Sequence, residues 1–132
     1  MNRRSGWFIA GFILLLASSW GLRNGPREWS LAENTAERFA SLIETCYGLL
    51  GLLTAAALYT GHPATRRLLL VWAGLITTTG GLAPVIWGGA PMLSGIAAGV
   101  ASATMAGFVV WLGGRALKAG VGPAAARTQG HP

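Results

Sequence analysis

The stretch from Phe39 to Thr60, FASLIETCYGLLGLLTAAALYT, decides the fold. Its 22 residues contain one charged side chain, Glu44. A helix needs about 20 consecutive, mostly apolar residues to cross a bilayer. The tripeptide Gly61–Pro63 follows, and glycine tolerates a left-handed cap while proline cannot continue a helix. The sequence therefore predicts a membrane-spanning helix over residues 39–60.

Three further apolar runs accompany this one, at residues 7–22, 68–87 and 92–112. Hydrophobic residues make up 52% of the 132-residue chain and charged residues 11%, whereas a soluble domain has about 25% charged residues. We therefore expect an all-α fold, an integral membrane four-helix bundle formed by residues 1–118. The tail 119–132 is rich in Gly, Ala and Pro without an apolar period, so we expect it to be disordered.

The first run is short for a membrane crossing, and two interpretations of it remain open. A signal peptide cleaved near Ala17–Ser19 would leave three crossings. Retention is favoured, because Trp7 and Trp20 bracket the run as interfacial anchors do.

The polar loop of the bundle is residues 23–38, RNGPREWSLAENTAER. The residues Asn24–Pro26 have turn chemistry and are predicted to end the first helix. Two pairs fit the pattern in which a cap side chain and a Glu three residues later satisfy free backbone amides: Ser30 with Glu33, and Asn34 with Glu37. The second helix is thus expected to begin before the membrane, and a plain solvated loop is the alternative.

Basic residues are distributed unevenly between the two ends of the predicted bundle. With the N-terminus in the cytoplasm, seven lie inside and three outside: Arg3, Arg4, Arg66, Arg67, Arg115, Lys118 and Arg127 against Arg23, Arg27 and Arg38. Cytoplasmic loops carry excess Lys and Arg, so we expect an N-in/C-in protein of the bacterial inner membrane with a cytoplasmic tail. The lipid bilayer is then its partner, and basic residues scattered at helix ends do not indicate nucleic-acid binding.

Glu44 is the sharpest polar feature, because it lies five residues after Phe39 inside an apolar run. Acids within the membrane usually face the bundle or a wet cavity and mark proton or ion paths. The alternative interpretation is that Glu44 reaches the outer headgroups, or pairs with Arg38 or another loop arginine, as an interface residue. Together with Tyr47, Glu44 forms the first part of a candidate intramembrane polar site.

The third run supplies the remaining candidates for this site, Thr77, Thr78 and Thr79. Three consecutive threonines cannot share one helix face, so some are expected to bond back to their own helix. The predicted helix kink follows them, at Gly80, Gly81 and Pro84, because a proline inside a helix removes a hydrogen bond.

Small residues mark the predicted packing faces, since they let helix backbones approach closely. Gly95 and Gly99 form a GxxxG pattern, whose partner is either another helix of this chain or another protein. The predicted helix-packing residues are Gly48 and Gly51 in the second run, and Gly95, Gly99, Ser102 and Gly107 in the fourth.

Aromatic residues near the ends of the runs fit an interfacial belt. In the predicted orientation Trp7, Tyr59 and Trp111 lie near the inner interface, and Trp20 and Trp87 near the outer one. Trp72 lies deeper, so we expect its ring to pack and its indole N–H to find a partner.

No pattern in the sequence supports an enzyme. The HExxH, P-loop, GxSxG and CxxC motifs are all absent, so we expect no catalytic residues, no metal site and no cofactor. A single cysteine, Cys46, excludes a disulfide within one chain, and with no basic neighbour in sequence it is expected to be a small buried apolar residue.

The stretch Glu44–Gly51, ETCYGLLG, sits in a layout of a short first span, a polar loop and two later spans joined by a tight turn. Over residues 7–117 this layout resembles small bacterial four-helix membrane proteins of the DoxX-like kind. Some of those resemble membrane subunits of redox complexes, which implies an accessory role.

Three functions remain open from the sequence. The first is a non-enzymatic accessory or assembly subunit of a larger inner-membrane complex, packing through its small-residue faces against other subunits or a second copy. The second is a small oligomeric transporter that couples to protons or cations through Glu44. The third is a redox-associated or quinone-associated membrane subunit.

Overall fold

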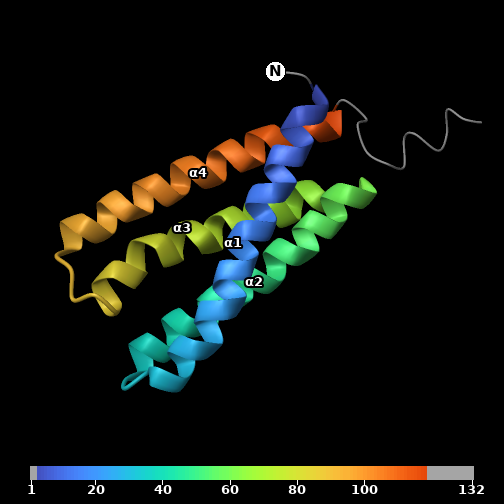
Figure 1. The fold of residues 1–132 in the computed structure, drawn as a ribbon. Coiled ribbons are helices and arrows are strands. Elements are labelled where there is room, and N and C mark those ends of the chain that lie inside the picture. The colour runs from blue at the N-terminus through green and yellow to red at the C-terminus, as the bar shows by residue number, and fades with distance from the viewer. Residues whose placement is uncertain (1–2, 119–132) are drawn as a thin grey trace, which may run out of the picture.

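The computed structural model describes residues 3–118 and folds them into four α-helices (Figure 1). These are α1 (Arg3–Leu31), α2 (Thr35–Thr60), α3 (Thr65–Ile86) and α4 (Met92–Lys118). All four are long and apolar enough to cross a membrane. The prediction of an all-helical chain with four helices is confirmed, and the tail 119–132 lies outside the described residues.

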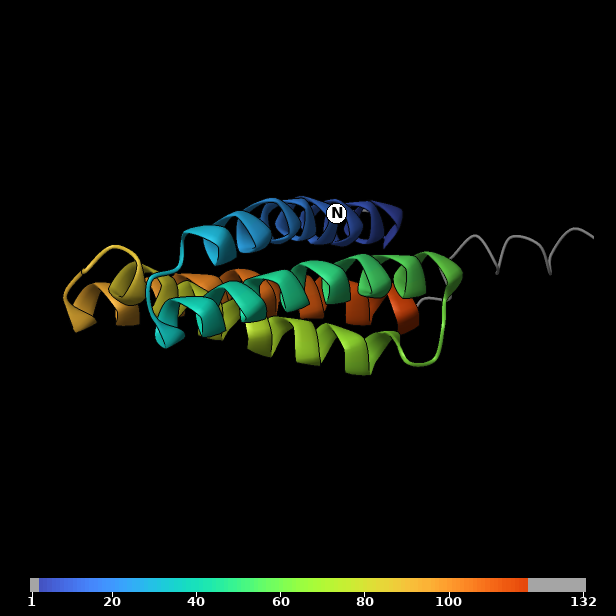
Figure 2. The ribbon, with the colours of Figure 1, turned by 90° about the horizontal axis from the view of Figure 1, so that it is seen from below.

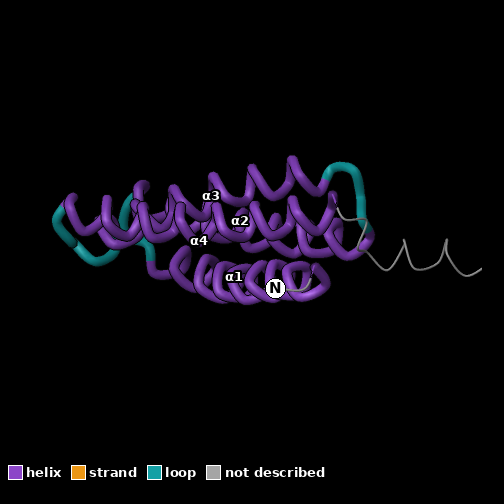
Figure 3. The backbone as a smooth tube through the Cα atoms, turned by 90° about the horizontal axis from the view of Figure 1, so that it is seen from above, coloured by secondary structure: helices purple, strands orange, loops and turns teal. Residues whose placement is uncertain are grey.

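The helices form two hairpins, α1–α2 and α3–α4, which also contact each other through α2 with α3 and α1 with α4. Figures 2 and 3 show α1 along one side of the other three helices. The start of α1, the end of α2, the start of α3 and the end of α4 gather at one end of the bundle, on the right in Figure 1. At the other end, the α1–α2 loop and the α3–α4 turn lie apart.

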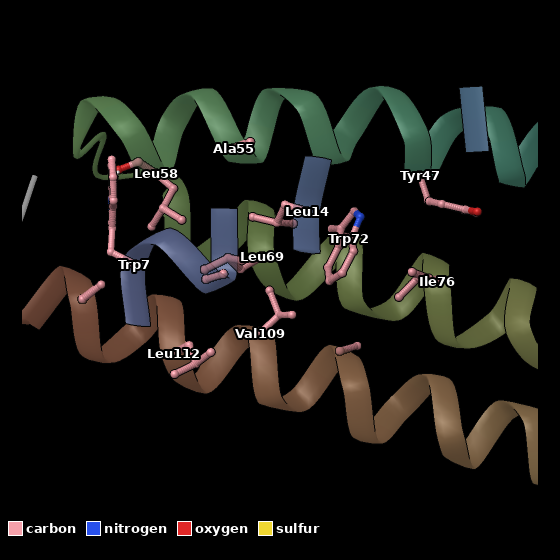
Figure 4. Packing of buried hydrophobic residues seen from close by; sticks show 13 residues of the cluster. Trp7, Leu14, Tyr47, Ala55, Leu58, Leu69, Trp72, Ile76, Val109 and Leu112 are labelled. Atoms are coloured by element: carbon pink, nitrogen blue, oxygen red, sulfur yellow. Dashed lines mark hydrogen bonds between the residues drawn. The ribbon is translucent and has the colours of Figure 1, made fainter. Parts of the chain in front are cut away.

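The apolar core lies where all four helices meet (Figure 4). Trp72 of α3 is fully buried there, with Leu14 of α1, Leu58 of α2 and Val109 of α4 in the same cluster. Between residues 80 and 105, by contrast, Gly95 is the one buried residue. This outer half of the α3–α4 hairpin therefore projects away from the shared core.

The predicted turn at Asn24–Pro26 is wrong, because α1 continues as a helix to Leu31. Gly25 is buried against Ser41 and Thr45 of α2, so its missing side chain permits close packing instead of a turn. Pro26 removes one backbone donor from the helix, a cost that this packing offsets. The break between α1 and α2 is residues 32–34, not 23–38.

One of the two predicted caps forms. Asn34 is the N-cap of α2: its side-chain oxygen accepts a 2.9 Å hydrogen bond from the Glu37 amide, and the Glu37 carboxylate accepts one of 2.6 Å from the Glu33 amide. Ser30 is not a cap, because it lies within α1 and donates to the Arg27 carbonyl. The helix therefore begins before residue 39, as predicted.

The other helix ends follow the sequence with one exception. Gly61 caps α2 in the left-handed conformation at φ 67°, and Gly89 in the α3–α4 turn has φ 56°. Helix α4 does not end with the predicted run at residue 112 but continues to Lys118, because Gly113 packs against Leu69 of α3 and Ala116 is buried. Tertiary packing thus extends both terminal helices beyond the predicted runs.

Candidate functional site

Glycines on α1 let this helix pack closely against the part of α2 that contains Glu44. A Cβ atom at Gly21 would lie 2.7 Å from the Glu44 carbonyl oxygen and 2.8 Å from Cε2 of Tyr47. A Cβ atom at Gly25 would overlap Oγ1 of Thr45. No larger residue fits at either position without moving a helix, so the two backbones meet directly beside Glu44.

The predicted packing residues of α2, Gly48 and Gly51, lie where α1 packs on this helix. A Cβ atom at Gly48 would lie 2.8 Å from the Leu22 nitrogen and 3.0 Å from the Ser18 carbonyl oxygen. At Gly51 it would overlap Oγ of Ser18 and lie 2.9 Å from Nε1 of Trp72. Gly48 and Gly51 therefore serve contacts within the chain.

Glu44 is buried in this contact, with 6% of its surface exposed. It lies nine residues after Thr35, the first residue of α2. The Tyr47 hydroxyl, itself buried, donates a long hydrogen bond of 3.4 Å to Oε1 of Glu44. The loop arginines Arg23, Arg27 and Arg38 are exposed, and within residues 3–118 none of them forms an ion pair with Glu44. The side chain therefore faces α1 within the bundle.

A second acid, Glu28 of α1, joins the site and was missed from the sequence. Its side chain lies within interaction range of Glu44, and its Oε2 is buried without a hydrogen-bond partner among the described residues. Gly21, Gly25 and Glu28 are spaced as i, i+4 and i+7, which places them on one helix face. This helical spacing could not be recognised from the sequence, because the predicted turn at Asn24–Pro26 placed Glu28 in a loop.

The hydroxyl groups around the two acids are occupied. Ser18 donates to the Leu14 carbonyl at 2.5 Å, Ser41 to the Glu37 carbonyl at 2.9 Å, and Thr45 to the Ser41 carbonyl at 2.9 Å. These bonds satisfy the hydroxyl protons within each helix, as is common for Ser and Thr in apolar surroundings. The oxygens of these hydroxyls and of Tyr47 keep lone pairs that can accept a hydrogen bond, and the two carboxyls are the acidic groups of the site.

The three threonines of α3 are not brought to Glu44. Thr78 and Thr79 donate to the carbonyls of Gly74 and Leu75, each at 2.9 Å, as expected for hydroxyls bonding back to their own helix. Thr79 is buried, Thr77 half-buried and Thr78 exposed. Among the described residues, none of them hydrogen-bonds to Glu44 or Tyr47.

The GxxxG residues of α4 pack against α3 of the same chain. A Cβ atom at Gly95 would lie 2.7 Å from the Gly81 carbonyl oxygen, and one at Gly99 3.3 Å from the Gly81 Cα. A Cβ atom at Gly80 would overlap Ser102.

Two further expectations concern these helices. Gly107 has no atom within 4 Å of a Cβ built on it, because it lies outside the face that Gly95, Gly99 and Ser102 share. Helix α3 stays helical through Pro84 to Ile86, and Gly80 and Gly81 serve its contact with α4. The kink at Pro84 remains a prediction.

Trp72 packs as expected, but its indole N–H has no hydrogen-bond partner within residues 3–118. Cys46 is exposed, which corrects its predicted burial. In sequence it lies between Glu44 and Gly48. The face of α2 that contacts α1 carries Glu44 and Gly48, and Cys46 lies outside that face.

The site is a pair of carboxyl groups with a phenol hydroxyl, enclosed by apolar helices. In the part of the chain that the structure describes, no three His, Cys, Asp or Glu side chains come together to hold a metal ion. Such a pair can bind and release a proton or a single small cation. No protein-family model matches the sequence, and no curated protein or solved structure was found to be similar to it.

Proposed function

We propose that this protein is a small, non-enzymatic membrane transporter that binds protons or small cations at Glu44. The observation that carries the proposal is the burial of the Glu44 carboxyl against α1, beside Tyr47 and Glu28 and with no basic partner among the residues that the structure describes. A buried carboxylate without an opposite charge is costly, and a bound proton or cation relieves that cost. Alternating occupancy of one such group is a simple basis for coupled transport.

Glu28 strengthens this proposal, because its carboxyl offers a second set of oxygen atoms beside that of Glu44. We propose that one proton or one small cation is bound between the two carboxyls. Tyr47 then orients the Glu44 carboxyl through its hydroxyl. A lone acid at the membrane interface would not need a second carboxyl or a tyrosine hydroxyl beside it.

Access to the pair is proposed from the end of the bundle that carries the α1–α2 loop. Glu28 is half-buried and lies three residues before Leu31, where α1 ends. We propose that this end faces outward from a bacterial inner membrane in an N-in/C-in orientation. The proposal rests on the excess of Lys and Arg at the other end.

Transport is tested with the full chain in proteoliposomes, by following proton flux with an internal pH dye as the external cation is varied. We expect flux in the wild-type protein and its loss in Glu44→Gln, with a marked reduction in Glu28→Gln. Glu33→Gln is the matched control, because that acid is exposed in the loop. Unchanged flux in Glu44→Gln would contradict the proposal.

A second candidate, an accessory subunit of a larger membrane complex, is favoured by the outer half of the α3–α4 hairpin. Residues 80–105 have one buried position, Gly95, and Gly107 faces away from the chain's own helices. A second copy of the chain or another subunit would cover this surface. The DoxX-like resemblance adds a subunit of a redox or quinone complex to these partners. Purification in mild detergent tests the idea, and a lone monomer under several conditions would count against it.

A further inference from the structure

The indole N–H of Trp72 is a buried hydrogen-bond donor in the centre of the core. The side chain is 0% exposed, and its Nε1 has no hydrogen-bond partner among the described residues. Figure 4 shows this nitrogen directed from α3 towards α2. A buried donor without an acceptor costs free energy, and native proteins pair nearly all such groups with protein or with ordered water. The position of Trp72 therefore requires an acceptor close to Nε1.

Ser18 of α1 brings a second buried polar atom to the same place. A Cβ atom at Gly51 of α2 would overlap Oγ of Ser18 and lie 2.9 Å from Nε1 of Trp72. The two polar atoms are therefore at most about 5 Å apart, a distance that two hydrogen bonds through one water molecule span. Ser18 is fully buried and donates its hydroxyl proton to the Leu14 carbonyl, so its oxygen keeps lone pairs as an acceptor. A donor and an acceptor thus lie together without a hydrogen bond between them.

Ser18, Gly51 and Trp72, which we call the three-helix junction, lie between the two hairpins. Ser18 and Gly51 belong to the α1–α2 hairpin, and Trp72 belongs to the α3–α4 hairpin. Within residues 3–118, no side-chain hydrogen bond joins α1 or α2 to α3 or α4. A polar link at the junction would add a directional contact to an interface that otherwise depends on apolar packing.

We propose that the three-helix junction binds one water molecule, which accepts a hydrogen bond from Nε1 of Trp72 and donates one to Oγ of Ser18. Water offers an acceptor and a donor in the smallest volume, and buried waters bond to polar groups that otherwise lack partners. A cation does not suit this position, because the indole N–H directs the positive end of its dipole into the site. The water links the two hairpins, and the site is independent of Glu44 and of transport.

The test detects water beside the indole proton of Trp72, by proton-detected solid-state NMR of the full chain in lipid with isotope-labelled tryptophan. Trp72→Phe identifies the signal by removing it. We expect magnetisation to transfer from water protons to the Trp72 indole proton. The indole signal of Trp7, whose N–H donates to the Leu58 carbonyl at 3.2 Å, serves in every variant to show that α1 is still packed on α2.

Two variants distinguish a bound water from a direct contact between Trp72 and the hydroxyl of Ser18. In Ser18→Ala the hydroxyl is gone and the Leu14 carbonyl is released as an acceptor, so we expect the water and its transfer signal to remain. In Ser18→Ala combined with Gly51→Ala, the overlap with Oγ is removed and the new methyl group lies beside Nε1 of Trp72. We expect this double variant to exclude the water and lose the transfer.

Three outcomes would overturn the proposal. The first is a wild-type protein without transfer from water to the Trp72 indole proton. The second is loss of the transfer in Ser18→Ala, because the serine hydroxyl itself would then be the partner of Trp72. The third is unchanged transfer in the double variant, which would show that water reaches Trp72 by a route outside the junction. None of these results depends on ion flux, so the proposed function is tested separately.

Discussion

The two hairpins of this protein use the same packing device for different purposes. Glycines let α1 approach α2 beside Glu44, and glycines let α4 approach α3 at Gly81. The first contact encloses an acid pair and a tyrosine hydroxyl. In the second, the glycines of α4 meet Gly81, and Gly80 meets Ser102. Close approach is therefore a packing property, and any chemistry depends on which polar side chain the contact encloses.

The largest expected effect comes from closing the space between α1 and α2. In Gly21→Ala the added methyl group meets the Glu44 carbonyl oxygen at 2.7 Å, and a backbone atom cannot rotate away. We expect the free energy of unfolding in detergent to fall by about 1–3 kcal/mol. Gly74→Ala is the control, because no atom lies within 4 Å of its new Cβ. Equal stability of the two variants would show that α1 does not pack on α2 as described.

The same change in the other hairpin separates packing from chemistry. Gly95→Ala places a methyl group 2.7 Å from the Gly81 carbonyl oxygen, so a similar loss of about 1–3 kcal/mol is expected in thermal unfolding. Below the unfolding temperature, ion flux should persist in Gly95→Ala and be reduced in Gly21→Ala. If both variants lose flux equally, the proposed difference between the hairpins fails.

A smaller effect is expected from the tyrosine hydroxyl. Tyr47→Phe removes the 3.4 Å hydrogen bond to Glu44 and should lower the free energy of unfolding by about 1 kcal/mol. In the Glu44→Gln background the same substitution should cost less, because the acceptor charge is gone. A double-mutant cycle by chemical denaturation measures this coupling. Additive effects would mean that the two side chains do not interact.

The smallest effect concerns the boundary between α1 and α2. Asn34→Ala removes the cap oxygen that accepts from the Glu37 amide, at a cost of about 1 kcal/mol or less. Ser30→Ala, the control, should change stability by less than about 0.5 kcal/mol, since Ser30 lies within α1. A larger cost for Ser30→Ala than for Asn34→Ala would restore the predicted cap at Ser30.

Features encoded locally could be predicted from the sequence. The apolar runs give the four helices, Asn34 with Glu37 gives the start of α2, and Gly61 gives its end, because each depends on residues a few positions apart. The turn at Asn24–Pro26 failed for the opposite reason. Contact of Gly25 with α2, a partner far along the chain, outweighs the local turn preference of that tripeptide.

The candidate site was only half predictable. Hydropathy marks Glu44 as unusual, but the rotation of α2 decides whether its side chain meets α1 or the headgroups, and no local pattern fixes that rotation. Glu28 was hidden by the predicted turn that placed it in a loop. The GxxxG pattern at Gly95 likewise identifies a packing surface, and its partner α3 follows only from the assembled fold.

The most direct test of the central claim, that α1 closes over residue 44 of α2, is the accessibility of this position to a water-soluble reagent. The existing thiol is first removed by Cys46→Ser, and Glu44→Cys and Glu33→Cys are then made separately in the full chain. Native membranes carrying each variant are treated with a membrane-impermeant maleimide. We predict rapid labelling of position 33 when the reagent reaches the α1–α2 loop. Position 44 should be labelled far more slowly, whichever side of the membrane the reagent is added to. Labelling of both positions at equal rates would contradict the account.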